Sequence, residues 1–157
     1  MKKFLKNKKG ISAIEILIAI ATIGVLAAIA VGSISSYRNQ QALKDTADDV
    51  VSLINRAHSN TLAGDSQLSW GVHFTSSAMT LFSGSSYSSG ASGNVVVPIS
   101  SAVTLSSISL NGAGSDIIFN RLYGDTNQYG TITVQLSSDA TKTRTITITK
   151  PGVVSAN

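Results

Sequence analysis

The chain has 157 residues, of which 43% are hydrophobic and 13% charged, which suits one small domain plus an apolar segment. It contains no cysteine, which excludes a disulfide framework, a thiolate nucleophile and a cysteine-based zinc site. The net charge of +4 comes from five lysines that precede Gly10, because the remaining residues include seven basic and eight acidic side chains. This charge would hold the N-terminal end on the cytoplasmic side of a membrane, and it gives little support to nucleic-acid binding.

One long helix is predicted over residues 11–63, after a short basic segment, residues 1–10, that ends in glycine. Residues 11–34 are almost wholly apolar and would form about 36 Å of helix, enough to cross a hydrocarbon core of about 30 Å. Residues 35–63 are more polar but keep an apolar stripe at spacings of four and three, which predicts an amphipathic helix half. The stripe consists of Leu43, Ala47, Val50, Ile54, Ala57 and Thr61. Gly64 stands where a C-cap is expected.

Residues 64–157 are predicted to form a β-rich head. Strands are expected at 69–75, 78–82, 94–99, 103–110, 117–120, 131–136 and 143–149, with Ser76-Ser77 as a hairpin turn. Residues 83–93 read as a flexible serine-rich loop and residues 137–142 as a connection. A head of about 90 residues needs a further apolar surface, and the stripe on residues 35–63 is the expected partner. The predicted fold class is therefore α+β, with an antiparallel β domain packed on a long N-terminal helix.

The most specific pattern lies in the first 36 residues, where KKG precedes ISAIEILIAIATIGVLAAIA. Glu15, the fifth residue after Gly10, is a carboxylate within an apolar run, where it is costly unless paired. This pattern resembles the leader and N-terminal helix of type IV prepilins. The resemblance implies cleavage by a prepilin peptidase between Gly10 and Ile11, N-methylation of Ile11, and pairing of Glu15 with the N-terminal amine of a neighbouring subunit during filament assembly.

The resemblance also implies a structural subunit of a type IV pilus or a type II secretion pseudopilus. Its partners would be other pilin or pseudopilin subunits, the inner-membrane assembly platform and, before assembly, the lipid bilayer. It would cross the inner membrane once, with the leader in the cytoplasm and the head outside, before joining a surface pilus or a periplasmic pseudopilus. No enzymatic activity, cofactor or metal is expected. The chain departs from many major pilins in having Ile11 rather than Phe, Gly32 rather than a kinking proline, and no C-terminal cysteine pair.

The β-rich region is similar to the GspH/FimT-type minor pseudopilins in three segments: NRAHSNTLAGDSQLSWGVHF, IIFNRLYGDTNQYGTITV and the closing TITITKPG. This similarity implies a minor subunit near the filament tip. The alternatives are a major pilin, a competence-type minor pilin that binds DNA, and a conventional secreted protein cut after Ala28-Ile29-Ala30. A hydrolase tethered by an uncleaved anchor is a further alternative.

Several head residues have both a structural and a functional interpretation. Trp70 and Phe74 are expected in the core rather than in a ligand platform, His73 is expected to be exposed, and His58 is expected on the polar side of the helix. A polar turn is favoured over a calcium loop for Asp116, Asn120, Asp125 and Asn127. A modest basic set could contact DNA phosphates: Arg121, Lys142, Arg144 and Lys150.

Overall fold

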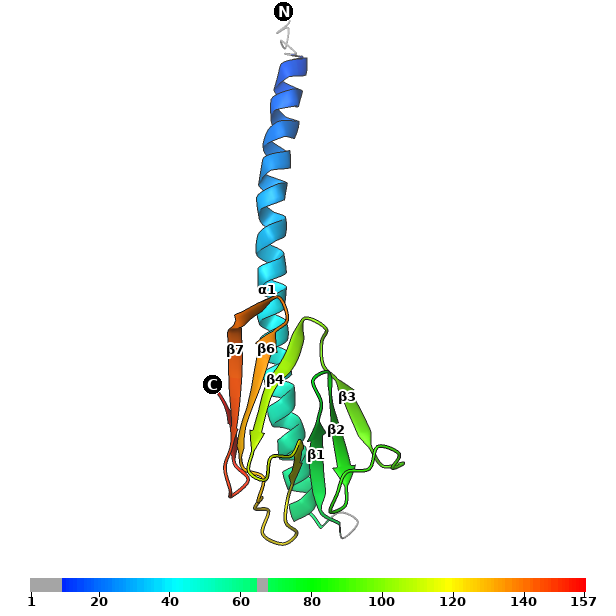
Figure 1. Ribbon diagram of the computed structural model, residues 1–157. Coiled ribbons are helices and arrows are strands. Elements are labelled where there is room, and N and C mark those ends of the chain that lie inside the picture. The colour runs from blue at the N-terminus through cyan, green and yellow to red at the C-terminus, as the bar shows by residue number, and fades with distance from the viewer. Residues whose placement is uncertain (1–9, 65–67) are drawn as a thin grey trace, which may run out of the picture. The chain divides into compact units, whose positions relative to one another are not determined.

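The computed structural model describes residues 10–64 and 68–157, with the backbone alone for residues 30–33. One long helix, α1 (Ala13–Leu62), precedes all of the strands in this described part (Figure 1). Two compact units meet between Tyr37 and Arg38, and α1 contributes residues to both. The prediction of a single helix over residues 11–63 is confirmed to within two residues at each end.

The first unit contains the apolar part of α1. The helix starts where the carbonyl of Ser12 accepts the backbone N–H groups of Glu15 and Ile16, at 3.0 and 3.3 Å. Large apolar side chains are exposed from Ile11 to Ile29, at 73% and 66%. An 18-residue window of α1 has a mean hydropathy of 2.6, so the helix is long and apolar enough to cross a membrane. A helix that is apolar on all sides is stable only when lipid or protein surrounds it.

The second unit contains two four-stranded antiparallel sheets. Sheet A has the order β3-β2-β1-β5 and sheet B the order β4-β6-β7-β8. Sheet A comprises β1 (Trp70–Phe74), β2 (Ala78–Ser83), β3 (Val95–Pro98) and β5 (Asp116–Ile118). Sheet B comprises β4 (Val103–Leu110), β6 (Gly130–Leu136), β7 (Asp139–Ile148) and β8 (Val154–Ala156). The predicted α+β class is therefore correct.

The strand predictions differ from the structure mainly in sheet B. β7 begins at Asp139, so the predicted connection over residues 137–142 is wrong and only a two-residue turn separates β6 from β7. The first half of β7 is polar and largely exposed, which made it look like a loop. β8 was not predicted, because its three residues, Val154–Ala156, are too few to show an alternating pattern.

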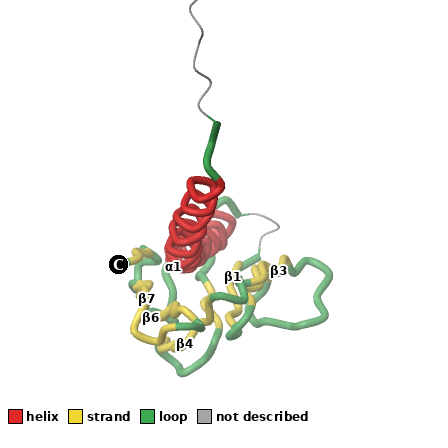
Figure 2. The backbone as a smooth tube through the Cα atoms, turned by 90° about the horizontal axis from the view of Figure 1, so that it is seen from above, coloured by secondary structure: helices red, strands yellow, loops and turns green. Residues whose placement is uncertain are grey.

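A single core joins the later part of α1 to both sheets. Figure 2 shows the backbone of these elements from above. Every residue of the predicted stripe is buried, from Leu43 at 6% exposure to Ile54 at 0% and Thr61 at 1%. Opposite the stripe lie apolar side chains of sheet A, such as Val72 and Phe74, and of sheet B. The expected partnership between helix and head is confirmed. Burial of each large apolar side chain contributes about 1.5–3 kcal/mol.

Thr61 fastens the end of α1 to the start of sheet A. Its hydroxyl donates to the carbonyl of Ala57 at 2.9 Å and accepts the backbone N–H of Trp70 at 3.0 Å. Three residues later Gly64 has a φ of +68°, a left-handed conformation that glycine adopts without strain. The predicted C-cap at Gly64 is confirmed, and it turns the chain toward β1.

We expect Thr61→Val to lower the free energy of unfolding by about 1–3 kcal/mol, because the half-buried N–H of Trp70 would lose its acceptor. Denaturant unfolding of the full chain in detergent would measure this change. Thr46→Val is the matched control, since Thr46 is also buried on α1 but makes no side-chain hydrogen bond within the described residues. Equal effects of the two substitutions would contradict the role given to Thr61.

Candidate functional site

The backbone around the predicted cleavage position is open. Gly10 and Ile11 precede the first residue of α1, and both are exposed. A side chain added at Gly10 would meet no other atom within 4 Å. The peptide bond between these residues is therefore accessible to another protein, although the basic residues before it lie outside the described part of the chain.

Glu15 lies in the first turn of α1, and its side chain is exposed. The positive end of the helix dipole stabilises a carboxylate there by about 0.3–1 kcal/mol. This contribution is smaller than the cost of a charged side chain in an apolar medium, which is about 2.5 kcal/mol or more. Within the described residues the only ion pair joins His73 to Asp116. A cation for Glu15 must therefore come from another molecule or from the segment before Gly10.

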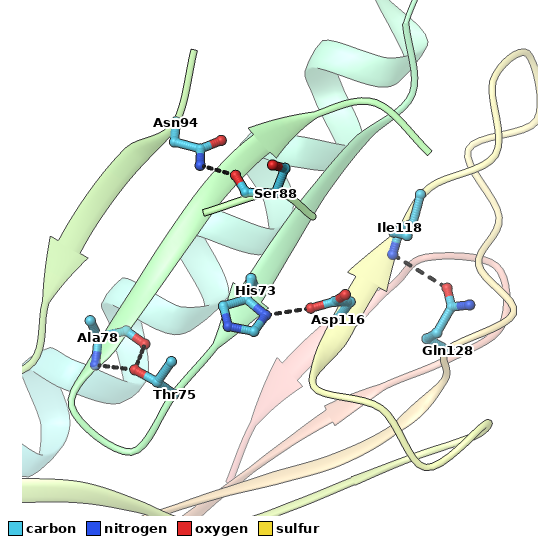
Figure 3. Close-up of polar contacts among 8 residues, drawn as sticks. All are labelled: His73, Thr75, Ala78, Ser88, Asn94, Asp116, Ile118 and Gln128. Carbon is cyan, nitrogen blue, oxygen red and sulfur yellow. Dashed lines mark hydrogen bonds and ion pairs between the residues drawn. The ribbon is translucent and has the colours of Figure 1, made fainter. Parts of the chain in front are cut away.

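His73 belongs to a small cluster on the outer face of sheet A, and Figure 3 shows its contact with Asp116. Its Nδ1 lies 2.5 Å from Oδ1 of Asp116 on β5, and its ring stacks on Tyr87 with centroids 3.9 Å apart. Tyr87 also meets the buried Phe82 edge-on, at 5.5 Å. The expectation that His73 is exposed is wrong, because only 22% of its side chain is exposed. Its direction away from Val72 was predictable, but both covering residues are distant in sequence.

The serine-rich segment over residues 83–93 is exposed but fastened. Tyr87 holds it against sheet A, and Asn94 donates from Nδ2 to the carbonyl of Ser88 at 2.8 Å (Figure 3). The N–H of Ala91 also bonds to that carbonyl, at 3.2 Å. These contacts fasten the loop to the sheet. The prediction of an exposed loop is confirmed, and its flexibility stays a prediction.

The oxygen-bearing residues considered for calcium do not converge. Asp116 pairs with His73, while Asn120 donates from Nδ2 to Asp125 at 2.9 Å. The main-chain carbonyl of Asn127 accepts a bond from Asn111. Among the described residues no three histidine or acidic side chains gather where a metal could bind. Asn120, Asp125 and Asn127 serve the turn between β5 and β6, as the polar-turn interpretation predicted. Asp116 instead begins β5, so the prediction of a turn is wrong for this residue.

His58 is packed rather than free on the polar side of α1, so that prediction is wrong. Its ring lies 5.1 Å from the ring of Phe119, at 58° to it. A Cβ on Gly124 would stand 2.7 Å from Nε2 of His58, and one on Gly152 would stand 3.1 Å from it. Because these two glycines have no side chain, the ring of His58 can pack against both of them. The sequence around His58 contains no local signal of this contact.

The four basic residues considered for DNA binding fall into two separate groups. Lys142 and Arg144 line a hollow beside Gln40 on α1. The carbonyl of Lys150 instead accepts the N–H of Thr126, in the turn that also contains Arg121. That turn lies near His58, which is about 27 Å along the helix from Gln40. The four residues therefore do not form one continuous basic surface.

The turn after β5 also presents an apolar tip that sequence reasoning missed. Leu122 and Tyr123 are 80% and 83% exposed. Leu122 has a φ of +79°, a left-handed conformation that is uncommon for a bulky residue. The following Gly124, with φ +69°, was the only local indication of a tight turn. The exposure of two large side chains at its tip depends on how the turn packs against α1.

These features define a class of architecture. An apolar N-terminal helix continues into a segment that packs on antiparallel sheets, which is a pilin-like arrangement. Comparison of the chain with protein-family models, with curated proteins and with solved structures found no match in any of the three.

Proposed function

We propose that the protein is a structural subunit, a minor pilin or pseudopilin, of a type IV pilus or a type II secretion pseudopilus. The observation that supports this most is the continuity of α1, which runs from a fully exposed apolar part into the core of the head. The same helix thus contributes both to a segment that needs a surrounding apolar medium and to a folded domain. The resemblance of the β-rich region to the GspH/FimT-type proteins favours a minor subunit.

In the proposed mechanism a prepilin peptidase cuts the exposed bond between Gly10 and Ile11, and the new amine of Ile11 is methylated. The apolar part of α1 rests in the inner membrane until the assembly platform transfers the subunit to the filament. There, Glu15 binds the N-terminal amine of a neighbouring copy, which removes the cost of an unpaired charge in an apolar surrounding. The same pair fixes the axial register between helices.

The alternatives fit the structure less well. A conventional signal-peptide cut after Ala30 would fall in the middle of α1, where an extended protease substrate is not available. Binding to DNA phosphates would require basic side chains on one continuous surface, but Lys142 and Lys150 belong to separate groups. We propose no enzymatic activity and no cofactor, and the residues of the head have structural roles in this proposal.

The intact mass and N-terminal sequence of the protein from its native host test the proposal. We expect a chain that begins at Ile11 and carries one added methyl group. Gly10→Leu should prevent cleavage of the chain. Gly24→Leu is the matched control and should leave cleavage intact, because an added Cβ meets no atom within 4 Å at either glycine. A wild-type chain that begins at Val31, or one that keeps Met1, would refute the proposed function.

A further inference from the structure

An acidic hollow lies between α1 and the edge of sheet A. It has a volume of about 340 Å³ and is lined by Ala42, Asp45, Thr46, Asp49, Met79, Pro98, Ile99 and Ser100. Asp45 accepts one hydrogen bond from Gln41, at 2.7 Å, and both aspartates are exposed. Neither makes an ion pair within the described residues. The hollow therefore combines an apolar floor with two negative charges that lack a cation.

A basic hollow lies between α1 and β7 of sheet B. It measures about 270 Å³ and is lined by Gln40, Leu43, Thr141, Lys142, Thr143 and Arg144. The nearby Asp139 accepts the N–H and the hydroxyl of Thr141 at 3.0 and 2.7 Å. These bonds, together with the charge of Lys142, hold the pKa of the Asp139 carboxyl below its ordinary value. Asp139 therefore offsets part of the positive charge, and the two basic side chains leave the hollow positive. Lys142 and Arg144 have no ion-pair partner among the described residues.

The two hollows flank one stretch of α1, residues 40–49. Gln40 and Asp49 are nine residues apart, about two and a half helical turns, so they point to opposite sides of the helix. Figures 1 and 2 show β7 on one side of the head and β3 on the other. Lys44 and Asp48 lie on α1 between the two hollows. Because their charges are opposite and cancel, one side of the head stays acidic and the other basic.

We propose that the acidic hollow of one head receives Lys142 and Arg144 of a second copy of this chain, an inference that rests on the proposed filament function. The two charges would meet Asp45 and Asp49, while the methylene stems of the basic side chains would lie on the apolar floor formed around Met79. Because the two surfaces differ, each copy can bind one neighbour on each side. Such a head-to-tail contact generates an open helical array when its rotation does not close.

The absence of cysteine allows a direct test by cross-linking in the native host. A double variant with Ser100→Cys and Thr143→Cys, at exposed lining residues that leave all four charges in place, should form a ladder of covalent multimers with a short bifunctional maleimide. The matched control replaces Ser100→Cys by Arg56→Cys, which lies on the same side of α1 as Asp49, about 10 Å further along. We expect the control to give no ladder. An equal ladder from both variants would overturn the proposed docking.

Charge reversal gives a second readout. Asp49→Lys or Lys142→Glu alone should reduce head cross-linking, measured between the cysteines placed at Ser100 and Thr143, by about tenfold or more. The two reversals together should restore it. Processed filaments without a ladder, or reversals without effect, would overturn the docking and leave the proposed function intact. A ladder from chains that retain Met1 would support the docking and refute the proposed function.

Discussion

Glu15→Leu is expected to abolish filament assembly while leaving cleavage after Gly10 intact. In the proposed filament the amine of Ile11 meets the Glu15 carboxylate of a neighbour. Removing one member of a buried pair leaves an uncompensated charge, at a cost of about 3–5 kcal/mol for each subunit. This cost recurs at every subunit added. Filaments sheared from cells and quantified by immunoblot and electron microscopy would measure the loss, and the N-terminal sequence of membrane-bound chains would show whether processing continues.

Thr22→Val is the matched control for Glu15→Leu. Thr22 is another polar residue in the apolar part of α1, but its hydroxyl already donates to the carbonyl of Ala19 at 2.9 Å. It therefore needs no partner from another molecule, and its replacement should leave filament yield unchanged. Normal filaments from Glu15→Leu would contradict the assembly role of Glu15, and loss of filaments from both variants would point to general damage of the helix.

Gly130→Ala is expected to destabilise the head by at least about 3 kcal/mol, from overpacking and backbone strain. Gly130 has a φ of +154° and begins β6, where it pairs with Leu110 of β4 and Ile148 of β7. An added Cβ would overlap the carbonyl oxygen of Ser109 and stand 3.0 Å from Cα of Leu110. Since these are backbone atoms, no side-chain rotation relieves the contact. Thermal unfolding of the full chain in detergent would measure the change.

Gly112→Ala separates the two causes of this effect. Gly112 also has a positive φ, +90°, but nothing lies within 4 Å of an added Cβ. Its replacement should therefore cost about 1–2 kcal/mol through backbone strain alone. If Gly130→Ala proved no more destabilising than Gly112→Ala, the close approach of β4 and β6 at Gly130 would not be the cause.

The local parts of this fold could be predicted from the sequence because their signals are periodic. The stripe from Leu43 to Thr61 follows the helical repeat, and all of it is buried. β4 lies at residues 103–110 as predicted, and Phe74 is in the core. Trp70, expected in the core, packs against it while only partly buried. For the candidate assembly site, the pattern from Gly10 to Glu15 is local as well, and the structure adds that these residues are exposed.

The parts that could not be predicted depend on contacts between distant residues. His73 is covered by Asp116 and Tyr87. Neither the spacing nor the polarity of these residues in the sequence predicts these contacts. His58 lies against glycines on two different turns. The division of the strands into two sheets has the same origin, because alternation reports which face of a strand is buried and not which strand lies beside it.

The path of the chain between the sheets has a consequence for how the head folds. It passes from β3 in sheet A to β4 in sheet B, back to β5 and again to β6. Sheet A is complete only when Ile117 pairs with Val72. This pairing closes a long loop, and the entropic cost of the closure precedes the contacts that offset it. A chain emerging from a ribosome or a membrane therefore holds an unfinished sheet until its last strands arrive. Because both sheets share one core with α1, we expect the head to fold in a single cooperative step, and a chain truncated before β6 should yield no stable half of a head.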